Sequence, residues 1–326
     1  MPAPRHAPPG RAWPVPVAFS TLAGLGAAAL LALVTGGREV ADDAPRLLVL
    51  ARHPLLPWTG YAGAGVSVLW GAFPPLLPAA FGLLVRPWTL VASDFWAIRL
   101  GVLGWEAVLL LAFDRYLAAR GRDVRDRRVA LLALALLPTW WLTAGIIPEE
   151  ETFVALFVLA IAAAAGRWGA DRVPAVLLAV AFLAAKYYLL VLAIPLAVFA
   201  PRPVRRFVAL VVPAGALLAA HVALQRATLG SVPLLGYQVP PTASLSLWGL
   251  LSRCGAAPAT RVVTVAGCAA AAGAALAASV ALRRANGEFE RAAAASLVAC
   301  VAFLPSTWPG YDLWAAPLVL GAAGRG

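Results

Sequence analysis

The chain has 326 residues, of which 62% are hydrophobic and only 13% are charged. This composition excludes an ordinary soluble domain and indicates an all-α membrane protein that crosses the bilayer several times. The net charge is +11, but the arginines lie in short clusters between apolar runs. The positive-inside rule explains such clusters, so we expect no nucleic-acid partner.

The first apolar segment, residues 14–35, predicts a membrane span whose N-terminal end lies in the cytoplasm. Arg5 and Arg11 precede this segment, and basic residues mark the cytoplasmic side of a span. The segment is long enough to cross the bilayer, and its flanks are those of an anchor rather than of a cleavable signal peptide.

After the first span, the sequence predicts an outer segment that does not cross the membrane. Residues 44–52 have apolar side chains on one helical face, which favours a short helix lying in the membrane interface. Residues 62–85 contain Pro74, Pro75 and Pro78, which disfavour a regular helix. We therefore expect a re-entrant or interfacial segment here.

The rest of the chain predicts alternating crossings. The densest basic cluster, residues 118–128, marks a cytoplasmic turn, and residues 226–261 form a long outer loop with a short helix at 244–251. Residues 173–200 are too many for one span, and Lys186 divides them, so we expect a hairpin of two short helices. The other expected crossings are residues 94–117, 129–147, 151–166, 207–225, 262–282, 292–304 and 311–322. Together these segments predict about ten transmembrane helices in a single membrane domain, with both termini inside and no separate soluble domain.

Two acidic groups fall on the outer side of this topology. Asp42 and Asp43 precede the predicted interfacial helix, and Asp43 stands at its N-cap position. Glu149, Glu150 and Glu151 follow one another at the outer end of a span. Crowded carboxylates are costly unless water, a metal ion or a cationic group lies near them. A solvated helix N-terminus, where glutamate favours the helix dipole, explains the three glutamates equally well.

Lys186 is the only lysine of the chain and lies in an apolar run. A charge at that depth needs a partner and marks a candidate functional site; the candidate partners are a ligand phosphate, Glu106 and Glu150. Snorkelling of the side chain to the interface is the alternative. Glu106 itself lies inside a predicted span, where we expect a structural ion pair with Arg99 or Lys186.

Several short motifs follow one another in a set order along the outer segments. They are Asp43, then Leu50-Ala51 at the end of the predicted interfacial helix, Gly60-Tyr61, the proline run from Phe73 to Pro78, Glu150-Glu151-Thr152-Phe153, Lys186 after an alanine-rich run, and the aromatic turn of residues 305–313. In this order they resemble the motifs of the GT-C glycosyltransferases, most closely those of the GPI mannosyltransferase 2 (PIG-V-like) group and its bacterial relatives.

The resemblance implies a GT-C fold and a mannosyltransferase-like glycosyltransferase. Such an enzyme transfers a sugar from a polyprenyl-phosphate donor to a glycan, glycolipid or protein acceptor on the outer side of the membrane. The membrane is then expected to be a bacterial plasma membrane, with membrane lipid as a further partner. The reaction requires no cofactor, although it leaves room for a divalent metal ion.

The same resemblance implies roles for the polar residues. Asp43 is expected to act as the general base, and Glu150 to orient the acceptor or assist the base. Lys186, with Arg46 or Arg52, is expected to neutralise the departing lipid phosphate. The rest of the expected substrate-binding set is Asp42, Glu149 and Glu151.

Two alternatives remain open on the residues alone. A transporter or lipid flippase would bind a cation at the outer carboxylates and would line a path through the membrane with charged side chains. An inactive GT-C relative would keep the fold without the transfer reaction.

Overall fold

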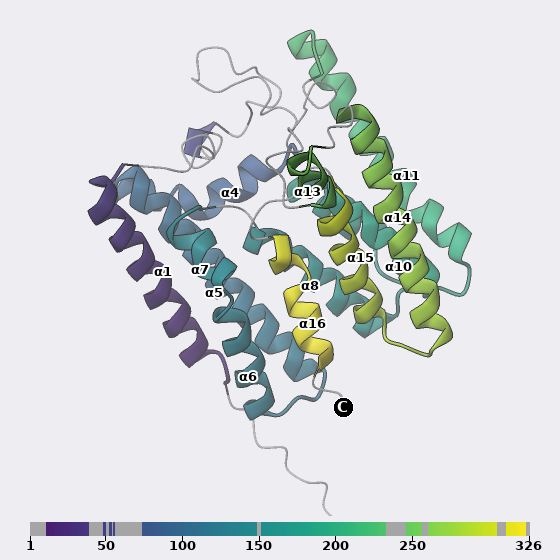
Figure 1. The fold of residues 1–326 in the computed structure, drawn as a ribbon, viewed down its shortest axis with the longest axis horizontal. Helices are drawn as coiled ribbons and strands as arrows, with labels where there is room; N and C mark the ends of the chain where they lie inside the picture. The colour runs from purple at the N-terminus through teal and green to yellow at the C-terminus, as the bar shows by residue number, and fades with distance from the viewer. Residues whose placement is uncertain are drawn as a thin grey trace, which may run out of the picture.

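The computed structural model describes residues 11–38, 48–49, 52–53, 55, 74–148, 151–232, 246–255, 260–304 and 311–323. Within these ranges every regular element is a helix, which confirms the predicted all-α class for this part of the chain (Figure 1). Most of the predicted interfacial helix and the first half of the predicted re-entrant segment lie outside the described residues.

The described helices are α1 (Pro14–Thr35), α4 (Leu77–Val85), η2 (Trp88–Leu90), α5 (Asp94–Ala119), α6 (Val124–Ala135), α7 (Pro138–Gly145), α8 (Glu151–Trp168), α9 (Ala175–Ala184), η3 (Tyr187–Leu192), α10 (Ala193–Val198), α11 (Pro203–Leu229), α13 (Leu247–Arg253), α14 (Thr260–Arg284), α15 (Phe289–Phe303), η5 (Tyr311–Trp314) and α16 (Ala316–Ala323). Helix α13 confirms the short helix expected in the loop between α11 and α14.

Five of the described helices, α1, α5, α8, α11 and α14, are long and apolar enough to cross a membrane. Helices α6 and α7 make a sixth crossing if the two are one bent span. The predicted count of ten is not reached because residues 173–200, 292–304 and 311–322 form helices shorter than 18 residues. The number of crossings therefore stays a prediction, whereas several apolar helices of membrane length are a property of the fold.

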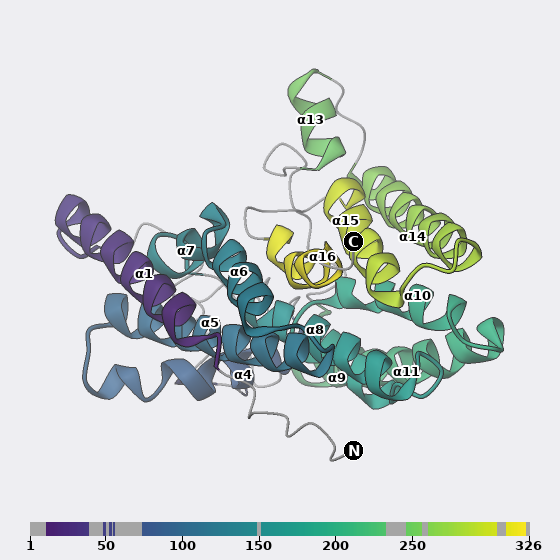
Figure 2. The same ribbon diagram turned by 90° about the horizontal axis from the view of Figure 1, so that it is seen from below.

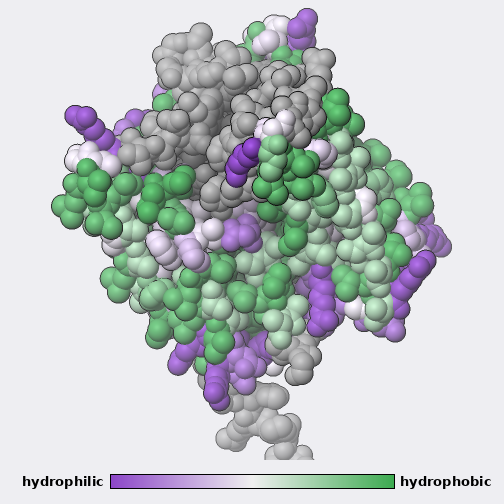
Figure 3. All heavy atoms as spheres, in the orientation of Figure 1, coloured by the Kyte–Doolittle hydropathy of each residue, from purple (hydrophilic) through white to green (hydrophobic). Residues whose placement is uncertain are grey.

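Helices α5 and α8 lie at the centre, and α1, α11 and α14 lie on the outside. In the most apolar stretch of each helix, 56% of the residues of α5 and 61% of those of α8 are buried, against 17% in α1 and α11 and 22% in α14. The three outer helices are also the more apolar ones, so much of the molecular surface is apolar (Figure 3). A water-soluble bundle presents polar faces to its solvent, so this arrangement suits a bundle surrounded by lipid.

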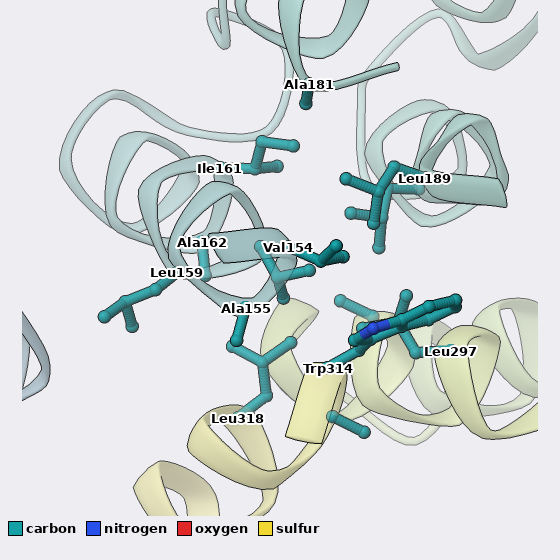
Figure 4. Close-up of a cluster of buried hydrophobic side chains, with 14 of the residues drawn as sticks. Val154, Ala155, Leu159, Ile161, Ala162, Ala181, Leu189, Leu297, Trp314 and Leu318 are labelled. Atoms are coloured by element: carbon teal, nitrogen blue, oxygen red, sulfur yellow. The ribbon is translucent and has the colours of Figure 1, made fainter. Parts of the chain in front are cut away.

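Helix α8 carries much of the hydrophobic core. Its buried side chains, Val154 among them, face Leu189 of η3, Leu297 of α15, and Trp314 and Leu318 from η5 and α16 (Figure 4). Because four elements close around α8, the position of its first residue is set by the packing of the whole bundle.

Proline divides the predicted crossing of residues 129–147 into two helices. Helix α6 ends at Ala135, α7 begins at Pro138, and the two are bent by 56°. Proline has no N–H to donate and disfavours a helical backbone in the residue before it. Leu137 accordingly has an extended backbone, with φ −60° and ψ 128°.

Lys186 divides residues 173–200, as predicted. Helix α9 ends at Ala184, Lys186 has an extended backbone with φ −141° and ψ 137°, and η3 then leads into α10. Arg206, near the start of α11, donates a hydrogen bond to the carbonyl of Val173, just before α9. Both ends of the segment therefore lie at the same end of the bundle, and the predicted hairpin of short helices is confirmed with Lys186 near its tip.

Helix α1 lies across α5, α6 and α7 and packs through small residues (Figure 2). Ser20, Gly24 and Ala28 recur every four residues on its buried face. At Gly145, the last residue of α7, an added Cβ would lie 2.6 Å from the Cβ of Ala27 and 2.9 Å from the carbonyl oxygen of Gly24. This close approach sets the position at which the chain leaves α7 toward the acidic residues.

Candidate functional site

Glu151 opens helix α8 and is almost completely buried, with 1% of its surface exposed. Its Oε1 lies 3.3 Å from Nζ of Lys186, and its Oε2 accepts a hydrogen bond from the indole N–H of Trp314. Both carboxylate oxygens thus have partners, as a buried charge requires. We refer to Glu151, Lys186, Tyr311 and Trp314 as the Lys186 site.

Lys186 reaches this site from the tip of the α9–α10 hairpin and is 9% exposed. Its ammonium group lies 5.1 Å from the centre of the Tyr311 ring, within the range of a cation–π interaction. Close to the tip, the backbone N–H of Leu76 donates to the carbonyl of Leu183 at 2.9 Å, so the residues just before α4 lie beside the hairpin. The ammonium is therefore largely removed from solvent but electrostatically compensated.

The short helix η5 supplies the aromatic wall of the site. The rings of Tyr311 and Trp314 stack with 4.2 Å between their centres, and the ring of Tyr188 lies 6.3 Å from that of Trp314. Asp312 bonds elsewhere, since its carboxylate accepts a 2.8 Å hydrogen bond from the hydroxyl of Thr139 on α7. Helix η5 thus contacts both α7 and α8, the two helices that the acidic residues connect.

Arg99 holds the end of α7 from the side of α5. It is fully buried; its Nε donates to the carbonyl of Gly145 at 2.9 Å, and its Nη2 lies 3.4 Å from the carbonyl of Ile146. Its Nη1 donates to the carbonyl of Phe95 at 2.9 Å. Carbonyls at the C-terminal end of a helix attract a cation, so this guanidinium stabilises the end of α7. The segment that leads to the acidic residues therefore begins at a fixed position at the end of α7.

The structure brings two of the predicted site residues together, Glu151 and Lys186. Arg52 pairs with Asp94 at the start of α5, at 2.7 Å, with 43% and 60% of the side chains exposed. An ion pair this exposed contributes little to stability, and the predicted role of Arg52 in phosphate binding stays a prediction. The remaining predicted residues, Asp42, Asp43, Arg46, Glu149 and Glu150, lie outside the described ranges, so their roles stay predictions too.

The predicted ion pair of Glu106 is wrong. Its Oε2 accepts a 2.8 Å hydrogen bond from the hydroxyl of Ser20 on α1, and that hydroxyl accepts one of 2.7 Å from the indole N–H of Trp140. Lys186 instead meets Glu151, and Arg99 lies two helical turns away, about 10 Å along the axis. Glu106 projects from the face of α5 that packs on α1 and α7; Arg99 shares this face but lies too far along the helix, and its guanidinium bonds to the carbonyls of Gly145 and Phe95 instead.

Tyr311 and Trp314 are functional candidates that the sequence-based set does not contain. The aromatic turn of residues 305–313 was the available signal, but a tryptophan beside an apolar run is more often a core residue. The hydrogen bond from Trp314 to Glu151 joins residues 163 positions apart. The sequence pattern near either residue does not predict a contact of that separation.

Chemically, the Lys186 site offers one cation and several aromatic faces in a region of low dielectric. The ammonium can bind a phosphate, and aromatic faces pack well against the apolar faces of sugar rings. Among the described residues, no three histidine, cysteine, aspartate or glutamate side chains gather closely enough to hold a metal ion. Four of the acidic residues predicted for the site lie outside those ranges, so a divalent metal ion at the site stays a prediction.

No protein-family model matches the chain, and no curated protein or solved structure matches it either. Two structural features characterise the described part of the chain. It has several apolar helices of membrane-spanning length around α5 and α8, and a buried lysine–glutamate–aromatic site where α8, η5 and the tip of the α9–α10 hairpin meet.

Proposed function

We propose that this protein is a membrane glycosyltransferase of the GT-C type, mannosyltransferase-like, that takes its sugar from a polyprenyl-phosphate donor. The observation that carries the proposal is the Lys186 site, in which one ammonium group lies between a carboxylate and an aromatic ring. The site is built from three segments that carry the resembling motifs: the start of α8, the end of the run that leads to Lys186, and the turn containing η5.

Lys186 is suited to the leaving group of the donor. When the bond between the anomeric carbon and the phosphate oxygen breaks, the electron pair goes to the lipid phosphate. A cation already fixed in a water-poor site stabilises that charge without having to reorganise. Glu151 and Tyr311 hold the ammonium in place before the donor arrives, so we assign them positioning roles.

The acceptor side of the reaction falls to the predicted carboxylates. Glu150 directly precedes Glu151, a residue of the Lys186 site, and consecutive Cα atoms are about 3.8 Å apart. We propose that Glu150 orients the acceptor and that Asp43 takes the proton from its hydroxyl as the oxygen attacks the anomeric carbon.

A transporter or lipid flippase is the second candidate, because helix α5 carries a row of buried ionisable residues. Arg99, Glu106 and Asp114 are all at most 5% exposed. Two of them are engaged locally, Arg99 with backbone carbonyls and Asp114 with Arg127 at 2.9 Å. Such fixed pairs are better suited to holding helices together than to passing a charge along, so the glycosyltransferase is favoured.

The two acidic residues of the outer segment provide the decisive comparison. Membranes containing the wild type, Asp43→Asn or Asp42→Asn are incubated with polyprenyl-phosphate [³H]mannose, and transfer to endogenous acceptors is measured. We expect Asp43→Asn to lose activity by about 10²–10⁴-fold while remaining at normal abundance, and Asp42→Asn to lose much less. Normal transfer by Asp43→Asn would remove it from the mechanism. Movement of the labelled lipid across the bilayer without sugar transfer would favour the flippase.

A further inference from the structure

The densest cluster of arginines in the sequence is largely occupied by contacts within the protein. Arg120 lies 2.5 Å from Glu290 and 3.8 Å from Glu288, Arg122 donates to the carbonyl of Gly321 at 3.0 Å, and Arg127 pairs with Asp114. These contacts join α5 and α6 to α15 and α16. These three arginines therefore stabilise the packing of the helices in the bundle.

A second group of arginines at the same end of the bundle is exposed and, among the described residues, lacks ion pairs of the kind that Arg120 and Arg127 form. Arg202 and Arg205 stand at the start of α11, and Arg283 and Arg284 at the end of α14. Among the described residues, no carboxylate forms an ion pair with any of the four. We call these four residues the arginine patch.

Contacts through α10 bring the two halves of the arginine patch together. Arg283 donates a hydrogen bond to the carbonyl of Val198, the last residue of α10. Arg202 follows Val198 by four residues, a stretch that spans at most about 14 Å. Next to them, Asp171 attracts Arg206, the neighbour of Arg205. Arg202 and Arg283 thus lie near the same end of α10, and Arg205 and Arg284 follow them within one helical turn on α11 and α14.

An exposed apolar surface continues from the arginine patch along α11 and α14. On α11, Val204 is 79% exposed, Phe207 41%, Val208 51% and Val212 59%. On α14, Leu276, two turns before the arginines, is 50% exposed. A row of cations that borders an apolar surface matches the boundary between lipid headgroups and acyl chains.

We propose that the arginine patch binds the headgroup of an anionic phospholipid, with the acyl chains lying along the exposed faces of α11 and α14. Guanidinium groups bind phosphate in a bidentate manner, and four of them between two helices suit a headgroup with two phosphodiesters better than one with a single charge. The proposal concerns a surface remote from the chemistry assigned to the Lys186 site, and it stands whether or not the protein transfers sugars.

The test is a lipid titration of the full chain purified in a neutral detergent. Cardiolipin, phosphatidylcholine or inorganic phosphate is added, and the melting temperature is followed. Cardiolipin at a hundredfold excess over its Kd should raise the melting temperature by about 4 °C. Phosphatidylcholine and inorganic phosphate should not. A rise of equal size with inorganic phosphate would show that a free anion suffices and would overturn the assignment to a lipid.

Two double variants carry the same change of charge at the same end of the bundle. Arg202→Gln with Arg205→Gln should raise the half-saturating concentration of cardiolipin at least about tenfold. These side chains are exposed, so the fold should persist. Arg125→Gln with Arg128→Gln, beside Asp123 and Asp126 on α6, is the matched control and should leave the titration unchanged. The proposal fails if both double variants bind like the wild type, or if both weaken binding equally, since the second result would mark a general effect of net charge.

Discussion

Replacing Lys186 with methionine takes away the ammonium group that lies 3.3 Å from Glu151, whose side chain is 1% exposed. Removing one partner of a buried ion pair typically costs about 3–5 kcal/mol, because the remaining charge stays desolvated. For a chain of 326 residues, the unfolding entropy typical of globular proteins is about 0.7 kcal/mol/K, so each kcal/mol shifts the melting temperature by roughly 1.5 °C. We therefore expect Lys186→Met to lower the melting temperature by roughly 4–7 °C.

Glu151→Gln should cost less than Lys186→Met. A glutamine oxygen can still accept the hydrogen bond from Trp314, and the ammonium keeps its contact with the Tyr311 ring and some exposure to solvent. The double variant should recover much of the loss caused by Lys186→Met, because the buried carboxylate charge is gone together with its cation. The expected coupling energy is at least about 2 kcal/mol.

Glu106→Gln is the matched control for this cycle, since Glu106 is also a buried glutamate but bonds to Ser20. Combined with Lys186→Met, it should give no recovery. The assay is thermal unfolding in detergent, read by the amount of monodisperse protein left after heating. Additive losses in the Lys186 and Glu151 cycle, or recovery by Glu106→Gln instead, would refute the assigned pairing.

Three further predictions concern the packing of α7 and the orientation of the chain. Gly145→Ala should destabilise the protein by about 1–3 kcal/mol, because the new methyl group meets α1. The control is Gly26→Ala, where nothing lies within 4 Å, and it should be neutral or slightly stabilising. Equal melting temperatures of the two variants would contradict the close approach of α1 and α7. Arg99→Met should lower stability by at least about 3 kcal/mol, since several buried carbonyls lose their donor, and Arg99→Lys by less; a stable Arg99→Met would show that the end of α7 needs no cation. In a cysteine-free background, Ser231→Cys should react with a membrane-impermeant maleimide in intact cells and Arg125→Cys only after permeabilisation, and the reverse would overturn the predicted topology together with the outer active site.

The helical class of the described chain and several local features were predictable from the sequence. Apolar runs separated by basic clusters indicate helices that cross the membrane repeatedly. The length of residues 173–200 indicates that this apolar segment is broken into shorter helices. The structure confirms that break at Lys186 and the short helix α13. The bend before Pro138 follows from a local rule as well, although the apolar pattern of residues 129–147 by itself predicts one crossing.

The site was predictable only in part. The rarity of a lysine in an apolar run singled out Lys186, and the crowding of three carboxylates singled out residues 149–151. The expectation for Glu106 failed because the sequence shows only that a glutamate inside a span needs a partner. It does not show which neighbouring elements the glutamate's face of the helix meets in the packed bundle. On α5 that face meets Ser20, a small residue that lets α1 come close.

The sequence by itself determined that the chain is helical, largely apolar and broken at a buried lysine, because these properties depend on composition and on residues within a turn or two of each other. Only the tertiary structure decided that the partner of Lys186 is Glu151. Successive residues of a helix diverge by about 100°, so Glu151 turns inward only because packing fixes the rotation of α8 about its axis. Contacts of α8 with α5, α9, α15 and η5 set that rotation, and the contact with η5 brings Trp314 to Glu151 across 163 positions of the chain.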